Sequence, residues 1–437
     1  MTEATAYEDR PANTRWLPPG LRPPGGISHR QALVFLLVGA AALMGGYDTN
    51  VFSFAVPQVQ ASLHIPEDKI GLTVSIIRLA AIPALLLAWT ADLIGRRRLL
   101  LFTIVGQAVA TLATGFAQDY AQFVWFQTAV RLFGYAEEML CYVVVAEELT
   151  DRSRGWADGT LAAMYYAGGG FTAAVFAAIT YLPYGWRSMY VIGSVPLFLV
   201  AYLRRYLPET RRFEAREQEV QKLSSRIAGA IDMTRRLLHE HPRRVAVMMI
   251  AIAAYGFAIW PAAVLGQKYM QSVLHFTPAE TVMVILPGGL VAAVLGILAG
   301  RLSDWIGRRR VIFGACFLAV VGYGTLYSGI HWQYVAYMWA VGFLGFICAD
   351  SLFAGLSAEI FPTAYRATVS GMRYVVSILC GAVSLALEGP LYNALGGHGL
   401  AVIVLLGTMP IAMIAVMKLP EPAGRSLEDI AAEPDRK

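Results

Sequence analysis

The sequence predicts an all-α membrane protein with twelve transmembrane helices arranged as two bundles of six. Three observations lead to this fold class. Of the 437 residues, 57% are hydrophobic and 15% are charged, and the mean hydropathy is +0.53, whereas a soluble domain carries about 25% charged residues. The chain also contains twelve apolar stretches, and a helix needs about 20 such residues to cross a bilayer. Finally, one charged heptapeptide occurs twice.

The apolar stretches are long and do not alternate at period two, which favours helices over a β-barrel. They lie near residues 33–56, 70–90, 99–118, 122–146, 156–181, 187–206, 244–270, 280–300, 311–329, 334–357, 367–391 and 398–418. The first 30 residues are polar and proline-rich, without the apolar core of a signal peptide.

Lysine and arginine gather on one side of the predicted spans. They lie mainly in the two tails and in the loops at 92–98, 151–154, 204–244, 301–310 and 362–366. In the opposite loops, Lys69 and Arg187 are the exceptions. The positive-inside rule therefore places both termini and the long central loop in the cytoplasm of a plasma membrane, most simply a bacterial inner membrane. The net charge of +5 reflects this bias rather than nucleic-acid binding.

Several classes of chemistry lack a signal in this sequence. The four cysteines fall inside apolar stretches, which argues against a disulfide framework, and the seven histidines are scattered, which gives no metal site. No G-x-x-x-x-G-K-[ST] phosphate loop is present. We therefore expect no cofactor and no enzymatic activity. The expected partners are a small-molecule substrate, protons and the lipid bilayer, and the chain is expected to be monomeric.

The repeated heptapeptide is DLIGRRR at 92–98 and DWIGRRR at 304–310, and 304 − 92 gives an offset of 212 residues. Other segments share this offset: EELTDRSRG with EIFPTAYRA, and LPET at 207 with LPEP at 419. We infer two homologous halves. Because six spans is an even number, both copies of each motif lie on the same side, as in parallel repeats.

These motifs resemble the cytoplasmic signatures of the major facilitator superfamily, in its sugar and organic-acid branches. The resemblance covers about residues 31 to 430 and implies two six-helix bundles that open in turn to either side. The predicted parts are a disordered cytoplasmic tail (1–30), a first bundle (31–206), a central loop (207–242), a second bundle (243–418) and a cytoplasmic tail (419–437). Two positions of the motif depart from the family pattern. Ala88 replaces a glycine in the first copy, and the basic residue that usually follows the aspartate is Leu93 in the first copy and Trp305 in the second.

Charges in the repeated loops are predicted to pair across helices and to hold the inward gate shut. The gating candidates are Asp92, Arg96, Arg97, Glu147 and Arg154, with Asp304, Arg308, Arg309, Glu359 and Arg366 as their repeats.

Asp48 lies inside the first span, in GGYDTNVF. A charge at mid-membrane is costly, so it invites a functional interpretation. Asp48 either makes a fixed contact, for example with Arg78 or Arg131, or it binds and releases a proton during transport. An aspartate at this place also resembles the proton-coupled aromatic-acid and metabolite symporters.

Arg78 and Arg131 lie inside the second and fourth spans. Each is either a permanent partner of an intramembrane carboxylate or a ligand for a substrate carboxylate, which a guanidinium can bind with two hydrogen bonds. Arg131, Tyr135 and Glu138 are spaced i, i+4, i+7 and should share one face, which we predict to line a cavity. Glu138 is a second candidate proton site, and Glu137 should point elsewhere.

The remaining site candidates are less sharply defined. Asp350 is the repeat equivalent of Glu138, and Arg373 lies near the inner end of the eleventh span. Glu388 is expected at the outer rim, where a carboxylate costs little. Tyr165, Tyr255 and Trp260 line the site or pack between helices. Their segments, MYYAGGG and YGFAIWP, and PGG at 287–289, are expected to break helix regularity. The central loop is expected to form short surface helices.

The sequence thus predicts a secondary transporter that imports a small organic acid or related metabolite together with protons. Two alternatives stay open. One is a transporter of a neutral sugar or polyol, although the seventh span lacks the paired glutamines typical of sugar porters. The other is a proton-antiport exporter, although such a cavity would be acidic and aromatic rather than arginine-bearing.

Overall fold

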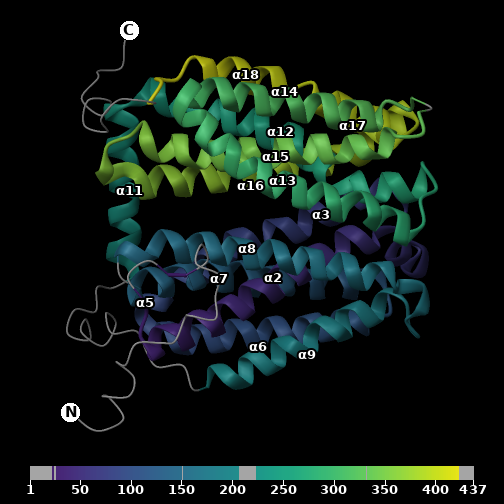
Figure 1. Ribbon diagram of the computed structural model, residues 1–437, viewed down its shortest axis with the longest axis horizontal. Helices are drawn as coiled ribbons and strands as arrows, with labels where there is room; N and C mark the ends of the chain where they lie inside the picture. Colours follow the sequence, from purple (N-terminus) through teal and green to yellow (C-terminus); the bar gives the residue numbers. More distant parts are fainter. Residues whose placement is uncertain (1–21, 24–25, 150, 206–222, 331, 423–437) are drawn as a thin grey trace. The chain divides into compact units, whose positions relative to one another are not determined.

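The computed structural model describes residues 22–23, 26–149, 151–205, 223–330 and 332–422, and helices dominate it (Figure 1). The α-helices of the first part are α2 (His29–Leu63), α3 (Ile70–Leu79), α4 (Ala81–Trp89), α5 (Ala91–Ile94), α6 (Arg96–Gly115), α7 (Tyr120–Glu148), α8 (Asp151–Ala177) and α9 (Trp186–Arg204). They are followed by α11 (Leu223–Glu240), α12 (Pro242–Ser272), α13 (Pro278–Ile306), α14 (Arg308–Tyr327), α15 (Met338–Glu359), α16 (Arg366–Leu395), α17 (His398–Leu406) and α18 (Met409–Met417). Short 3₁₀ helices are η2 (Glu67–Lys69), η3 (Ile179–Tyr181), η4 (Val335–Tyr337) and η5 (Thr363–Tyr365).

These helices supply the predicted spans. Within the described residues, ten helical stretches are long and apolar enough to cross a membrane. Two further helices, α7 and α8, have similar lengths of 29 and 27 residues. The polar groups of α7 and the glycines and tyrosines of α8 lower their hydropathy. Together the ten stretches and these two helices match the twelve predicted spans.

The chain divides into two compact units. The first comprises residues 1–63 and 80–223, and the second comprises residues 64–79 and 224–437. The second span is therefore divided, because η2 and α3 pack in the second unit while α4 and α5 pack in the first. Residues 64–79, which the sequence analysis assigned to the first bundle, owe this placement to the packing of α3 on α16.

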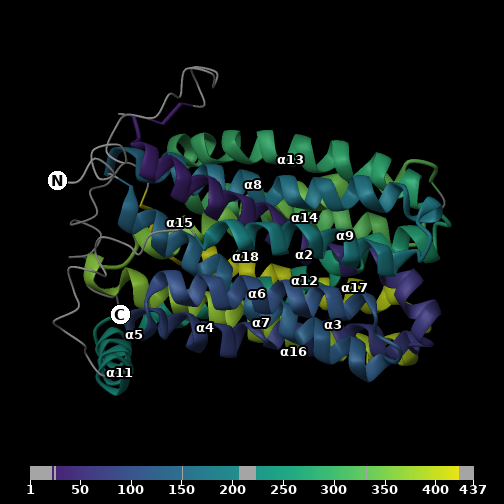
Figure 2. The same ribbon diagram turned by 90° about the horizontal axis from the view of Figure 1, so that it is seen from below.

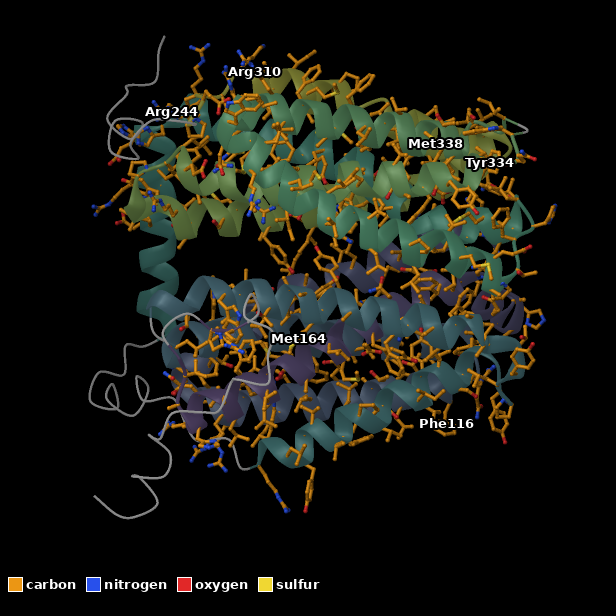
Figure 3. The ribbon with its side chains drawn as sticks, in the orientation of Figure 1. Phe116, Met164, Arg244, Arg310, Tyr334 and Met338 are labelled. Carbon is orange, nitrogen blue, oxygen red and sulfur yellow. The ribbon has the colours of Figure 1, made fainter. Side chains whose placement is uncertain are left out.

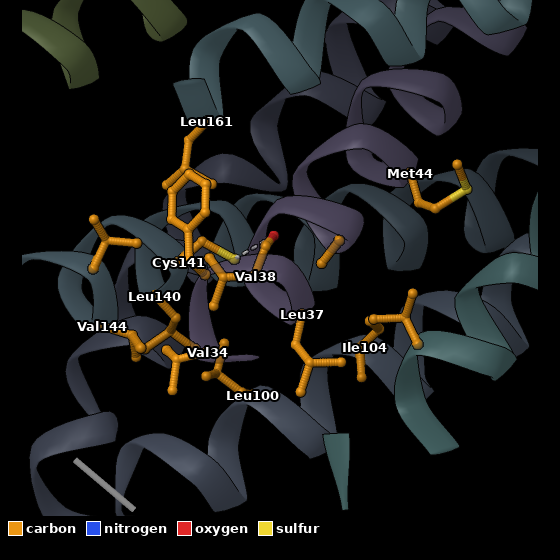
Figure 4. Packing of buried hydrophobic residues seen from close by; sticks show 14 of the residues in the cluster. Val34, Leu37, Val38, Met44, Leu100, Ile104, Leu140, Cys141, Val144 and Leu161 are labelled. Carbon is orange, nitrogen blue, oxygen red and sulfur yellow. Dashed lines mark hydrogen bonds between the residues drawn. The ribbon is translucent and has the colours of Figure 1, made fainter. Parts of the chain in front are cut away.

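The first unit is a bundle in which α2 packs on α8 and α6 packs on α7 and α9. Its apolar core joins these helices, as the close view in Figure 4 shows. The α2–α8 contact is unusually close. A Cβ atom at Gly46 would lie 1.8 Å from the Tyr165 carbonyl oxygen, and one at Gly168 would lie 1.9 Å from the Leu43 carbonyl oxygen. Small residues that let backbones approach in this way are typical of membrane helix packing.

In the second unit, α12 packs on α16 and α18, α15 packs on α13 and α14, and α3 packs on α16. Figure 2 shows α3 and α16 side by side. Gly389 of α16 lets η2, which precedes α3, approach as closely, because a Cβ atom there would lie 1.9 Å from the Asp68 carbonyl oxygen. The first turns of the second span are thus tightly held by this unit.

Large apolar side chains cover the outside of these helices. On α13 alone, Leu290, Val294 and Ile297 are 64%, 61% and 68% exposed. Figure 3 shows Arg244 and Arg310 at one end of the second unit and Tyr334 and Met338 at the other. A lipid-facing apolar surface with arginines at one end and aromatic residues at the other is typical of an integral membrane protein.

Three helices differ from the expectation of broken segments. The helices α8, α12 and α13 run without interruption through MYYAGGG, YGFAIWP and PGG, so this prediction was wrong. The glycines serve close helix packing instead, and Pro261 and Pro287 are accommodated inside α12 and α13. Helix breaks occur elsewhere, at Ala80 between α3 and α4 and near Gly407 between α17 and α18.

Most of the predicted tails and part of the predicted central loop fall outside the described residues. Residues 1–21, 206–222 and 423–437 lie outside them. The described part of the central loop forms a single helix of 18 residues, α11, rather than several short ones. The hydroxyl of Tyr365 donates a hydrogen bond of 2.6 Å to Glu240 at the end of α11. This bond raises the pKa of Tyr365, because the Glu240 carboxylate stabilises the protonated phenol that donates to it.

Candidate functional site

The first unit contains a pocket between α2, α6, α7 and α8. Its lining includes five of the predicted site residues: Asp48, Arg131, Tyr135, Glu138 and Tyr165. The i, i+4, i+7 spacing on α7 places Arg131, Tyr135 and Glu138 along this pocket, as the shared helix face predicts. Five side chains that the sequence singled out therefore lie around one pocket, and their roles stay predictions.

Asp48 lies at the polar side of this pocket and is 1% exposed. Its Oδ2 atom accepts hydrogen bonds from Gln107 Nε2 at 3.0 Å and from Thr111 Oγ1 at 2.7 Å, both on α6. Its Oδ1 atom has no hydrogen-bond partner in the described structure. Both donors are neutral, and Arg131 acts on this carboxylate electrostatically without forming an ion pair within 4.0 Å.

Arg131 does not form the fixed ion pair that was one of its two predicted roles. Its Nη2 atom donates a hydrogen bond of 2.6 Å to the Thr49 carbonyl oxygen. Among the described residues Arg131 makes no ion pair within 4.0 Å with Asp48 or Glu138. The carbonyl of Thr49 orients the guanidinium, and its remaining N–H groups can face a ligand in the pocket.

Glu137 also lines this pocket, although the sequence predicted that it would point elsewhere, and it forms a buried ion pair that sequence reasoning missed. It accepts hydrogen bonds from Arg204 on α9 and from Thr103 on α6. Arg204 is fully buried and Glu137 is 3% exposed. In the sequence, Arg204 stands at the end of the apolar stretch at 187–206 and was counted with the charges at 204–244. A long cationic side chain can nevertheless reach back into the bundle.

Arg78 belongs to the second unit, where its guanidinium carbon lies 3.2 Å from the centroid of the Trp260 ring. This is a close cation–π contact between α3 and α12. The indole Nε1 of Trp260 lies 3.4 Å from Ser377 Oγ on α16, which fixes the ring. Since Asp48 and Glu138 belong to the first unit, the pairing of Arg78 with either of them stays a prediction.

Two further predicted residues of the second unit form an ion pair. Arg373 Nη1 on α16 lies 3.8 Å from Asp350 Oδ1 on α15, and the Asp350 side chain is 42% exposed. Arg78 acts electrostatically on the same carboxylate. Asp350 therefore lies near two arginines, which leaves this region with an excess of positive charge.

Tyr255 has a different environment. Its side chain is 1% exposed, and its hydroxyl donates a hydrogen bond of 3.0 Å to the Phe346 carbonyl oxygen. This position corresponds to packing between helices, which was the alternative role of Tyr255. A contact of Tyr255 with substrate stays a prediction that this geometry does not favour.

The arginine-rich loops contain equivalent ion pairs in the two units. Arg96 Nη2 lies 2.9 Å from Glu147 Oε1, joining α6 to α7. At the 212-residue offset, Arg308 donates from Nε and Nη2 to both carboxylate oxygens of Glu359, each at 3.1 Å, joining α14 to α15. Arg308 also lies 2.6 Å from Asp304. Each pair joins two helices of one unit, and a gating role stays a prediction.

The second arginine of each loop also follows the repeat. Arg97 donates to the carbonyl oxygen of Arg205 at 2.6 Å, and Arg309 donates to that of Met417 at 2.9 Å. Because 97 + 212 = 309 and 205 + 212 = 417, these contacts are equivalent. Glu421, from the LPEP segment, accepts hydrogen bonds from the backbone N–H groups of Arg308 at 2.7 Å and Arg309 at 3.1 Å. It thereby caps α14, a role that sequence reasoning missed.

The structure gives fewer contacts for the other gating candidates. The side chains of Asp92 and Arg154 lie outside the described residues. Arg366 stands at the start of α16, and the described residues give it no ion pair within 4.0 Å.

The expectation for Glu388 was wrong. Glu388 is 0% exposed on α16, and its Oε1 atom lies 2.5 Å from Nδ1 of His398. Distance along the helix suggested a solvated rim, but the packing of α3 and α17 covers this carboxylate. His398 and Lys268 were also missed, although a lysine inside an apolar stretch is itself a signal.

Comparisons with known proteins agree with the fold. The family model of the Major Facilitator Superfamily matches residues 38–385. The "Probable 4-methylmuconolactone transporter" of Cupriavidus pinatubonensis is 26% identical over 415 residues, covering 92% of this chain and 94% of the relative. The "Cis,cis-muconate transport protein" of Acinetobacter baylyi is 25% identical over 393 residues, covering 86% and 91%.

Among solved structures, the crystal structure of a D-xylose-proton symporter matches with a TM-score of 0.73 at 17% identity, covering 90% of this chain and 99% of that one. A likeness at this identity concerns the fold. The matched family model spans 348 of the 437 residues, since 385 − 38 + 1 = 348. The chain belongs to the Major Facilitator Superfamily of transporters.

Proposed function

We propose that this protein is a proton-coupled symporter that imports a small organic acid by alternating access. The names of two relatives that span most of the chain, a muconate transport protein and a methylmuconolactone transporter, support an organic-acid substrate. We place the protein in a plasma membrane with both termini in the cytoplasm, as the positive-inside rule indicates.

The observation that carries this proposal is the pocket of the first unit. It combines a buried carboxylate held by neutral donors, Asp48, with an arginine that makes a single hydrogen bond, Arg131. A carboxylate in such a place is stable when it holds a proton and costly when it is ionised. An arginine in the same pocket can bind the carboxylate of a substrate with two hydrogen bonds.

The two roles can be coupled through charge. A proton on Asp48 removes one negative charge from the surroundings of Arg131, which favours entry of an anion. When the anion leaves, the positive charge of Arg131 again acts on Asp48 and favours its ionised form. The proton then leaves as well, and the pocket returns to its starting charge. Glu138, on the same face of α7, is the second candidate to carry the proton.

We assign a second anion-binding region to Arg78, Arg373 and Trp260 in the second unit. The excess positive charge around Asp350 supports this assignment, as does the aromatic ring beneath the Arg78 guanidinium. An unsaturated organic acid could place its carboxylate on the arginines and its flat carbon chain on the ring.

The test is uptake into proteoliposomes that contain the purified protein. The panel consists of cis,cis-muconate, 4-methylmuconolactone and D-xylose, each with and without an inward proton gradient. We expect at least one acid to accumulate, and to do so only with the gradient. Accumulation of xylose alone would favour the neutral-solute alternative, and outward movement driven by the gradient would favour the exporter.

The arginines are tested separately by substrate affinity. Arg78→Gln should weaken binding of the accumulated acid by about tenfold, the effect of about 1.4 kcal/mol. Arg98→Gln, on an exposed side chain of the arginine-rich loop, is the matched control. Unchanged affinity in the Arg78→Gln protein would remove Arg78 from the substrate site.

A further inference from the structure

Four ionisable side chains meet at the end of the second unit that lies away from the arginine-rich loops. They come from four elements: Glu67 from η2, Lys268 from α12, Glu388 from α16 and His398 from the start of α17. Nδ1 of His398 lies 2.5 Å from Glu388 Oε1, and Nε2 lies 2.9 Å from Glu67 Oε2. Lys268 Nζ lies 2.5 Å from the same Glu67 oxygen. We call these four residues the His398 cluster.

The His398 cluster is largely shielded from water. Glu388 is 0% exposed, Lys268 is 1% exposed and His398 is 9% exposed. The Glu67 side chain, at 41% exposed, is the member that solvent reaches. Buried charges are tolerated when they are paired, and two carboxylates balance one ammonium and one imidazolium. The cluster is therefore electrically balanced when His398 carries a positive charge.

The geometry also requires that proton. Ionised carboxylates only accept hydrogen bonds, and a neutral imidazole has a single N–H group. Because both ring nitrogens of His398 lie beside carboxylate oxygens, a neutral ring would set one nitrogen lone pair against a carboxylate. Loss of the proton therefore breaks one of the two contacts and leaves the cluster with an excess negative charge.

The elements around the cluster carry few other charged groups among the residues that the structure describes. On η2, Asp68 accepts a hydrogen bond of 3.3 Å from Asn393 of α16, and Lys69 is the other charged residue. On α16, the ring of Tyr392 lies 4.4 Å from the His398 ring. On α3, the charged residue is Arg78. It lies more than one helical turn along the chain from Glu67, and its guanidinium lies over the Trp260 ring.

The neighbouring helices α12 and α14 present phenols. Tyr269 on α12 contacts Tyr327 on α14 edge to face, and the Tyr327 hydroxyl donates to the Ala262 carbonyl oxygen at 2.8 Å. Tyr323 on α14 is buried as well. Close packing fixes Glu388, because a Cβ atom at Gly71 of α3 would lie 2.9 Å from its Oε2 atom.

The cluster has no counterpart in the first half. Subtracting 212 from positions 268, 388 and 398 gives Val56, Phe176 and Trp186, which are buried apolar side chains. The fold therefore does not need charges here, since the same places in the other bundle are filled by hydrocarbon. Buried ionic groups that a fold does not require point to a specific role.

The position of Glu67 suggests that role. Glu67 begins the second span, of which residues 67–79 pack in the second unit and α4 packs in the first. We propose that the His398 cluster is a proton-binding latch, which holds residues 67–79 against α12, α16 and α17 while His398 is protonated and releases them when that proton leaves. This latch is distinct from the Asp48 pocket and does not depend on which solute is transported.

The latch is tested by a fluorescence contact between α16 and η2. Bimane is attached at Asp68→Cys, and Asn393→Trp supplies a quencher on the residue that contacts position 68. The four native cysteines are replaced by alanine. Because histidine titrates between about pH 5 and pH 8, we expect strong quenching near pH 6 and at least a twofold rise in fluorescence towards pH 9.

Two variants of the cluster should then respond in opposite ways. In His398→Gln the proton is absent, so fluorescence should be high and independent of pH. In Glu388→Gln the amide can donate to a neutral imidazole that still donates to Glu67, so quenching should persist at high pH. His275→Gln, on an exposed histidine of the same unit, is the matched control and should keep the parent response.

A parent protein that stays quenched across the whole range, while remaining monodisperse, would overturn the proposal and leave the cluster as a static contact. The same holds if His275→Gln abolishes the response, or if Glu388→Gln and His398→Gln behave alike.

Discussion

The arginine-rich ends of the two units match closely, whereas their membrane interiors do not. At the ends, Arg96–Glu147 and Arg308–Glu359 are equivalent ion pairs. The preceding glycines have nearly the same backbone, with φ of 101° at Gly95 and 105° at Gly307. In the interior, the 212-residue offset places Asp48 on Trp260 and Arg131 on Phe343.

This difference separates two kinds of residue in a duplicated transporter. Features kept in both halves serve what both halves need, which is the joining of successive helices at one end of the bundle. Features found in one half serve functions that the duplicated scaffold does not provide, such as the binding of a proton or of a particular solute. The repeat therefore identifies the scaffold, and departures from the repeat identify the candidate sites.

The largest expected effect concerns the buried pair of the first unit. Arg204→Val should lower the free energy of unfolding by about 3–5 kcal/mol, because it leaves the Glu137 charge buried without its partner. The second half has Ala349 and Val416 at the equivalent places, both buried. The double variant Glu137→Ala with Arg204→Val should therefore recover most of the loss.

Thermal unfolding in detergent measures both variants. A single variant as stable as the parent would show that the pair adds nothing to the first unit. A double variant as unstable as the single one would show that the halves are not interchangeable at this place.

A smaller effect tests whether the two ends are equivalent. At Gly95 and Gly307 the backbone has positive φ and ψ near 145°, a region that side chains with a Cβ atom rarely adopt. Gly95→Ala and Gly307→Ala should each cost about 1–3 kcal/mol. Gly307→Ala also brings a close contact, since its Cβ would lie 2.8 Å from Glu421 Oε2.

Unfolding of the two variants is again the measurement, with Gly324→Ala as the control on open helix surface. If one substitution is harmless and the other is severe, the equivalence of the two ends fails.

The smallest effect concerns the interior. Arg131→Gln should weaken binding of the transported acid by about tenfold, or about 1.4 kcal/mol, by removing a charged donor from the pocket. Because Phe343 holds the equivalent place, Phe343→Leu should leave affinity unchanged. Binding is measured by the concentration dependence of uptake, and equal affinities in Arg131→Gln and the parent would exclude Arg131 as an anion ligand.

Much of the fold could be predicted from the sequence, because hydropathy and a repeat at one offset are properties that a single chain displays directly. The shared face of Arg131, Tyr135 and Glu138 was predictable for the same reason, since helical spacing sets it. Partners from distant segments were not predictable. Nothing near Asp48 in the sequence indicates Gln107 or Thr111, which reach it from α6.

The missed charges share a second cause. Arg204 and His398 stand at the ends of apolar stretches, where no burial was predicted for them, and Glu388 was placed near a rim, where a carboxylate costs little. Whether a residue near a helix end meets water depends on which neighbours cover it, and packing decides this. Lys268 differs, because its place within an apolar stretch was visible and should have been weighed.

The central claim is that uptake of an organic acid moves a proton through Asp48. It is tested most directly by a pH-sensitive dye inside proteoliposomes to which the transported acid is added without a preset gradient. We expect acidification of the interior with the parent protein and with Asp232→Asn, an exposed control on α11. We expect none with Asp48→Asn, which should still exchange labelled for unlabelled acid. Acidification by Asp48→Asn at the parent rate would contradict the account.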